Sequence, residues 1–144
     1  MNKTVFYTKK QDSYTWFVVN AEEKTLGRLS SEISKVLLGK TDVDYNPSQA
    51  IKNAVIIINA EKIKVTGKKE TDKFYYRHSG RPGGLTIETF KELQKRIPIR
   101  IIEKSVKGML PKGGLGRELF TKLKVYKGPE HPHKAQNPKE LNIN

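Results

Sequence analysis

Glycines alternate with basic residues in one stretch near the C-terminal end of the chain, residues 107–117, KGMLPKGGLGR. Glycine lets a backbone approach a bulky partner closely, and the Lys and Arg side chains here have few acidic neighbours. A phosphate-binding loop of the GxxxxGK[ST] type is one interpretation, but Gly113 is followed by Gly114 and not by Lys. A structural turn and a backbone contact to nucleic-acid phosphates are the alternatives. The basic composition favours the nucleic-acid contact, and therefore a large anionic partner.

A second candidate combines aromatic rings with cations at residues 74–78, FYYRH. Such a mixture is typical of surfaces on which RNA bases stack. In a strand, Phe74, Tyr76 and His78 face one side, and Tyr75 and Arg77 face the other. We expect one set to lie in the core and the other to face RNA, and the sequence leaves open which set does which.

His131 and His133 alternate near the C-terminus, HPH, and have three interpretations. They are metal ligands, exposed tail residues, or rings that pack against or hydrogen-bond nucleotides. The chain has no cysteine, and Glu130 is the one acidic residue close by. The basic surroundings favour the contact with nucleotides, and we expect no metal site.

The acidic residues do not form a pattern that indicates catalysis. Asp42 and Asp44 form one close pair and Glu22 and Glu23 another, and both pairs lie in predicted turns, where acids bond the local backbone. No Gly-x-Ser-x-Gly elbow is present. We therefore expect no catalytic residue, no cofactor and no small-molecule substrate.

The distribution of charge supports an anionic partner. The 144 residues include 28 Lys and Arg against 15 Asp and Glu, a net charge of +13. Residues 21–53 are neutral overall, whereas residues 54–106 carry +6 and residues 107–144 carry +5. The sequence has no apolar run of the roughly 20 residues that a membrane span needs, and no basic amphipathic helix or secretory signal. This pattern favours nucleic acid over a membrane surface.

These side chains are positioned by a single predicted α/β domain, residues 1–144. A strand-like run at residues 16–20, with Trp16 as a core anchor, precedes an amphipathic helix over residues 26–37 that ends at Gly39. A β-branched run at residues 54–59 then predicts a strand buried on both faces. Strand, helix and strand in this order predict a parallel βαβ unit.

The second half is predicted to be mostly helical after a strand at residues 73–78. Thr86 is expected to cap a helix, Pro98 to start a second one that Pro111 stops, and residues 115–123 to form a third. Residues 1–14 are expected to form an arm. Residues 129–144 are expected to form an extended tail, because prolines replace apolar residues there.

Six motifs in order resemble one family, the large-subunit ribosomal protein thirteen family of bacteria and plastids. They are KTLGRL at residues 24–29, NAEK at 59–62, TGKK at 66–69, HSGRPGG at 78–84, the glycine-rich stretch at 107–117, and LKVY at 123–126 with HPHKAQ at 131–136. The resemblance covers residues 14–138. The sequence of the fourth motif is more similar to that of cyanobacterial and plastid members of the family than to that of other members. The sequence departs from the family between Tyr45 and Val55, where Asn46-Pro47 replaces a Thr-Pro pair and residues 49–53 replace an Asp-x-Gly-Asp element.

The resemblance implies a three-layer α/β/α fold with a small parallel or mixed central sheet. It also implies a structural protein of the large ribosomal subunit, in bacterial cytoplasm or plastid stroma, that binds large-subunit rRNA and neighbouring ribosomal proteins during early assembly. It implies no catalysis. The alternative is a free-standing RNA-binding regulator of translation.

We predict two kinds of rRNA contact. Packing or hydrogen bonding to nucleotides is expected from His78, Tyr126, His131 and His133. Phosphate contacts are expected from Arg28, Lys35, Lys40, Lys68, Lys69, Arg77, Arg81, Lys107, Lys112, Arg117, Lys122, Lys124, Lys127 and Lys134.

Overall fold

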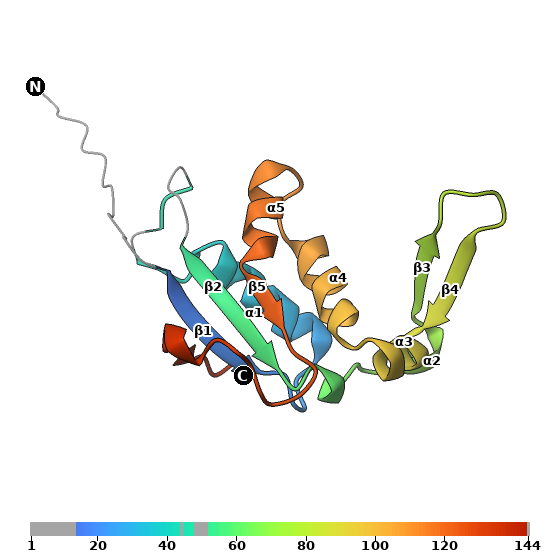
Figure 1. Cartoon of the computed structure of the whole chain (residues 1–144), viewed down its shortest axis with the longest axis horizontal. Coiled ribbons are helices and arrows are strands. Elements are labelled where there is room, and N and C mark those ends of the chain that lie inside the picture. Colours follow the sequence, from blue (N-terminus) through green and yellow to red (C-terminus); the bar gives the residue numbers. More distant parts are fainter. Residues whose placement is uncertain (1–13, 44, 48–51, 144) are drawn as a thin grey trace, which may run out of the picture.

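A four-stranded parallel sheet forms the centre of the molecule (Figure 1). The computed structural model describes residues 14–43, 45–47 and 52–143, so nearly all of the predicted arm, Asp44 and much of the departure from the family pattern lie outside the described residues. The strand order is β5-β2-β1-β6, with the bounds β1 Thr15–Asn20, β2 Asn53–Ile58, β5 Leu123–Val125 and β6 Lys139–Glu140. Every neighbouring pair in this sheet is parallel.

The predicted βαβ unit is confirmed. Helix α1, Leu26–Leu37, connects β1 to β2, and Trp16 lies opposite Ala54 in the sheet. The apolar residues Leu29 and Ile33 of α1 are fully buried, as their spacing predicted. Gly39 follows the helix with φ +68°, a left-handed conformation that suits glycine after a helix end.

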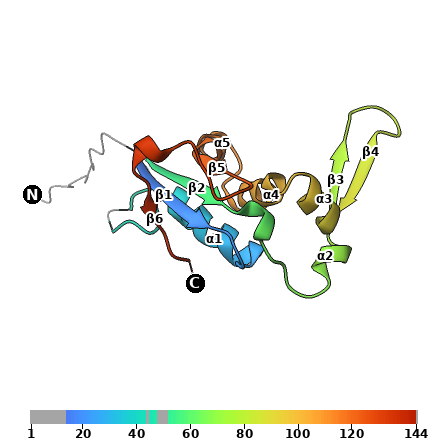
Figure 2. The same cartoon turned by 60° about the horizontal axis from the view of Figure 1, so that its bottom comes forward.

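Helices flank the sheet, which confirms the predicted three-layer α/β/α class (Figure 2). Helix α3 spans Phe90–Arg96, α4 Ile99–Met109 and α5 Gly114–Thr121. The core joins α1, β2 and α4 through buried side chains such as Ile33, Ile57, Ile101, Ile102 and Val106. No helix among the described residues is long and apolar enough to cross a membrane.

A two-stranded antiparallel hairpin extends away from this core (Figures 1 and 2). It consists of β3, Phe74–His78, and β4, Leu85–Thr89, and the four-residue helix α2, Lys69–Asp72, precedes it. The strand at β3 was predicted, but the helix start at Thr86 was not correct, because residues 85–89 pair with β3. The helix begins after Thr89 instead.

Thr89 and Glu92 explain where α3 begins. The backbone N–H of Glu92 donates to Thr89 Oγ1 at 3.3 Å, and the backbone N–H of Thr89 donates to Glu92 Oε2 at 2.8 Å. This reciprocal capping box satisfies two amides that have no partner inside the helix. The bonds from Thr89 also lower the pKa of the Glu92 carboxyl, because they favour its charged form.

The C-terminal segment differs from the prediction in two places. The third helix ends at Thr121, and residues 123–125 form β5 beside β2. Beyond residue 128, the single-turn 3₁₀ helix η2, Lys134–Gln136, precedes β6, and Ile143 is buried in the core. The tail does contain apolar anchors, and they hold its end against β1. A second short 3₁₀ helix, η1 Ala60–Lys62, follows β2.

Candidate nucleic-acid interface

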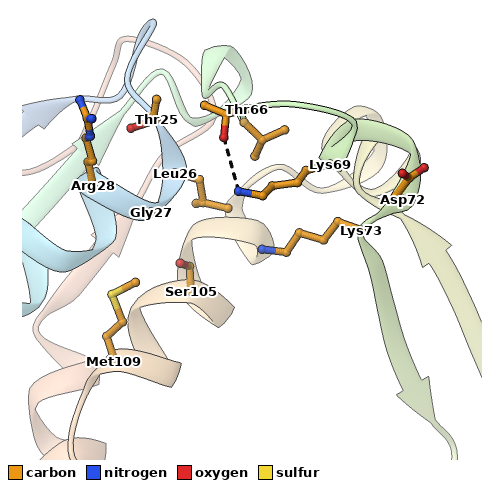
Figure 3. A pocket seen from close by; sticks show the side chains of 11 residues that line it. Thr25, Leu26, Gly27, Arg28, Thr66, Lys69, Asp72, Lys73, Ser105 and Met109 are labelled. Carbon is orange, nitrogen blue, oxygen red and sulfur yellow. Dashed lines mark hydrogen bonds between the residues drawn. The ribbon is translucent and has the colours of Figure 1, made fainter.

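A basic cleft lies where the start of α1 meets α2, the loop before α2, and α4 (Figure 3). Its volume is about 780 Å³. Leu26, Val65 and Met109 contribute its apolar wall, and the polar lining includes Arg28, Lys69 and Lys73. We call this hollow the basic cleft.

Cations outnumber acids in the basic cleft. Arg28, Lys69 and Lys73 line it together with one acidic residue, Asp72. In Figure 3 the ammonium groups of Lys69 and Lys73 extend towards α1 and α4, whereas the carboxylate of Asp72 points away from them. Lys69 Nζ lies 3.4 Å from Thr66 Oγ1 and forms no ion pair among the described residues. The cleft therefore presents uncompensated positive charge around an apolar wall.

The first turn of α1 adds to this positive field. Residues 25–28 line the cleft, and the first turn of α1 contains no acidic residue and no side-chain cap. The amide of Leu26 bonds to the carbonyl of Lys64, at 2.9 Å, which fixes the start of the helix against the neighbouring loop. The N-terminal end of a helix dipole is positive, so this arrangement suits a phosphate group.

The basic cleft unites part of the predicted site. Arg28 and Lys69 were predicted, and α1 and α2 bring them to one hollow; Lys68 lies next to the cleft as the residue before α2. Lys73 was missed, although its place beside the aromatic run was a usable signal. Ser105 was also missed, because nothing in the sequence indicates that α4 approaches α1.

The aromatic strand β3 has one packed ring and one exposed face. Tyr75 packs against the core, and its burial raises the pKa of its hydroxyl. Phe74 and Tyr76 are 49% and 61% exposed, and His78 beside them is exposed as well. Of Tyr75 and Arg77, which the alternation places on one side, only Tyr75 packs against the core, and Arg77 is exposed. Contact of the exposed rings with RNA stays a prediction.

Three other predicted nucleotide contacts pack against one another. Tyr126 Oη lies 2.7 Å from His133 Nε2, and the rings of His131 and His133 are stacked with centroids 6.4 Å apart. The ring of Trp16 stacks on His133 at 5.3 Å. Trp16 is thus half-buried on the sheet and is not the core anchor that the sequence indicated. Among the described residues, no group of three or more His, Asp or Glu side chains is placed to hold a metal ion.

Some predicted phosphate contacts form ion pairs within the protein. Lys35 Nζ lies 2.7 Å from Glu32, and Lys127 Nζ lies 3.8 Å from Glu61. Lys122 is only 9% exposed and lies 3.0 Å from Glu118. Their charges are partly neutralised before any partner binds.

The remaining predicted cations are not gathered into the basic cleft. Arg77 and Lys107 line a second hollow beside α4. Lys124 is half-buried on β5, and the exposed others are distributed over the end of α1, the hairpin tip, the α4–α5 turn, α5 and the tail: Lys40, Arg81, Lys112, Arg117 and Lys134. None of these five residues, nor Lys124, forms an ion pair with another described residue.

The glycine-rich stretch forms a turn between α4 and α5, as the proline and glycines predicted. Helix α4 ends at Met109, before Pro111, and Gly113 has φ +132° just before α5. A Cβ on Gly116 would lie 1.8 Å from the carbonyl oxygen of Pro111. Gly116 is therefore required by the packing of the turn itself, and a backbone contact to RNA here stays a prediction.

The acidic pairs have structural partners. Glu22 lies 2.6 Å from Lys62 Nζ, and this contact lowers the pKa of Glu22 and raises the pKa of Lys62. Glu23 lies 3.3 Å from Lys64, and Asp42 accepts a hydrogen bond from the buried amide of Asn53 at 3.2 Å.

Comparison with known proteins places the chain in a family. The model of the family described as Ribosomal protein L13 matches residues 14–132. The large ribosomal subunit protein uL13c of Guillardia theta is 61% identical over 98% of this chain and 99% of its own length. The large ribosomal subunit proteins uL13 of Prochlorococcus marinus strain NATL1A and Crocosphaera subtropica are 58% and 57% identical over all of this chain and 96% and 95% of their own lengths. With the parallel sheet and the motifs in place along the chain, these matches confirm the predicted resemblance: the chain belongs to the ribosomal protein L13 family.

Proposed function

We propose that this chain is a structural component of the large ribosomal subunit, in the cytoplasm of a bacterium or in a plastid, where it binds large-subunit rRNA and supports early assembly. The family match over residues 14–132 carries this proposal, together with relatives that are named as large ribosomal subunit proteins along their whole length. The family is structural rather than catalytic. Neighbouring ribosomal proteins are further partners of the same assembly.

The basic cleft supports a mechanism of phosphate neutralisation. Arg28, Lys69 and Lys73 supply charge, and the N-terminal end of α1 supplies a positive dipole beside them. Such contacts position a protein on RNA without reading bases directly. In this proposal a backbone phosphate of rRNA occupies the cleft, and the other predicted phosphate contacts hold further phosphates.

Co-sedimentation tests the proposal against the free-standing regulator. We expect the protein to remain in purified large subunits after a high-salt wash that removes loosely bound proteins, because a component of the assembled subunit keeps its contacts with folded rRNA and neighbouring proteins when salt weakens its phosphate contacts. A protein found wholly outside the subunits would contradict the proposal and favour the regulator.

A matched pair of variants tests the cleft itself. R28Q combined with K69Q should be washed from the subunits at lower salt than the wild type, since both charges line the basic cleft. K139Q combined with K95Q makes the same charge change on β6 and α3, at exposed lysines that do not line the cleft and are not among the predicted phosphate contacts. Equal loss of both double variants would contradict a special role for the cleft.

A further inference from the structure

A second hollow lies between the hairpin and the helices α4 and α5, with a volume of about 340 Å³. We call it the α4 hollow. Tyr76 and Arg77 of β3 line one side, and Arg100, Lys104 and Lys107 of α4 line the other, with Phe120 of α5 beside them. It is distinct from the basic cleft, to which α4 contributes Ser105 and Met109.

The spacing along α4 creates one basic stripe. Arg100, Lys104 and Lys107 follow each other at intervals of four and three residues, so they share one face of the helix. Glu103 is the one acidic residue that lines the hollow. No ion pair of Arg77, Arg100, Lys104 or Lys107 occurs within the described part of the chain. The hollow is therefore an electropositive site that the protein does not neutralise itself.

Aromatic rings accompany these cations. Tyr76 is 61% exposed. Lys107 Nζ lies 5.7 Å from the centre of the Phe120 ring, and Lys104 Nζ lies 5.2 Å from that of Tyr75. These contacts hold two ammonium groups at the rim while leaving their charges without an anion.

Rings and cations together match one kind of ligand. An unpaired nucleotide offers a flat base that stacks on an exposed ring and a phosphate that attracts Arg and Lys. In a duplex the base faces are covered by their neighbours in the stack, so paired RNA would use only the cations. A volume near the lower end of ligand pockets, about 300 Å³ and above, suits one nucleotide.

We propose that the α4 hollow binds a single unpaired nucleotide of RNA, with its base on Tyr76 and its phosphate held by Arg100 and the stripe of α4. The inference rests on the proposed function, and it adds base stacking to a mechanism that otherwise uses phosphates alone. Arg100 and Lys104 become contact residues that the sequence did not single out.

Two labelled RNA hairpins test the proposal on the purified full-length protein. They share one stem, and one of them carries a single unpaired adenosine in it. We expect the wild type to prefer the hairpin with the unpaired adenosine, and Y76A to lose about tenfold in affinity for that RNA while its affinity for the paired stem stays unchanged. Y76F keeps the ring and should bind as the wild type does. Y45A removes another exposed tyrosine and should change neither affinity.

The electrostatic half of the site has its own measurement. R100Q should reduce the slope of log affinity against log salt by about one for the RNA with the unpaired adenosine. Urea unfolding of each variant checks that the fold is intact, which we expect because Tyr76 and Arg100 are exposed.

The possible outcomes separate this inference from the proposed function. Equal affinity of the wild type for both hairpins, or equal effects of Y76A on both, would overturn the nucleotide site and leave phosphate binding intact. Binding to neither hairpin would contradict the proposed function as well. Tyr76-dependent binding of a labelled hexaglutamate peptide, without an effect of Y76A on RNA, would assign the hollow to an acidic protein segment instead.

Discussion

Lys122 and Lys124 are separated by one residue, yet their surroundings differ. Lys122 is buried after α5, lies 3.0 Å from Glu118 Oε1 and has its ammonium 5.6 Å from the centre of the Tyr14 ring. Lys124 is half-exposed on β5, where the described residues provide no ion pair. Burial makes the first lysine part of the fold, and exposure leaves the second available to a partner.

Substitution by alanine should affect mainly stability at Lys122 and mainly RNA binding at Lys124. K122A should lower the free energy of unfolding by about 1–3 kcal/mol, because it removes a charged hydrogen-bond partner and a buried side chain. K124A should change stability by less than about 0.5 kcal/mol and weaken binding to rRNA. Urea unfolding and RNA affinity of both variants measure the two effects. Unchanged stability of K122A with weaker RNA binding would instead support Lys122 as a phosphate contact.

The residue types predicted which side chains are charged, but they did not predict which oppositely charged residues lie beside them. The spacing of three residues between Glu32 and Lys35 in the predicted helix was a usable signal for their ion pair, whereas nothing in the sequence shows that Glu61 lies near Lys127. The pair of Lys127 and Glu61 joins residues far apart in the sequence, and only the fold brings them together. Arg28 and Lys69 were predicted separately for the same reason, although they line one cleft.

At the scale of elements, the α4–α5 turn depends on one glycine. Gly116 packs against the Pro111 carbonyl, whereas Gly108 in α4 has open space where a Cβ would lie. The two positions therefore form a matched pair within the same basic stretch.

We expect G116A and G108A to shift stability in opposite directions. G116A should destabilise the protein by about 1–3 kcal/mol, because the backbone must move to admit the methyl group. G108A should stabilise it by about 0.4–1 kcal/mol, because alanine reduces the freedom of the unfolded chain and favours helix. Urea unfolding curves of both variants test this. A neutral G116A would show that the turn adapts and that the glycine is not required by packing.

Elements with buried periodic faces were predictable, and exposed or very short ones were not. The spacing of buried residues in α1 identified that helix correctly. Strand β4 was missed because Leu85 and Ile87 are both 53% exposed, so no buried period distinguished it from the start of a helix. Strand β5 has three residues, and its pairing with β2 is a long-range contact that local pattern does not encode.

For the whole molecule, the net charge of +13 predicts how binding responds to salt. If about six cations contact duplex-like phosphates, log affinity should fall with log salt at a slope near −5. R28Q combined with K69Q should reduce the steepness by about two, and K139Q should leave it unchanged. Titrations of rRNA fragments between about 50 and 200 mM salt measure these slopes. A slope near zero would contradict phosphate neutralisation.

The projecting β3–β4 hairpin has a consequence for the amount of unbound protein that a cell can tolerate. Phe74, Tyr76, Leu85 and Ile87 are exposed on one face of it, and a two-stranded sheet is barely stable in water by itself. Its free strand edges offer backbone groups that other chains can pair with. A newly synthesised copy that is not bound to rRNA therefore exposes a hairpin that other chains can pair with and that proteases can cleave. We expect cells to match production of this chain to that of rRNA, because surplus copies would aggregate or be removed by proteases.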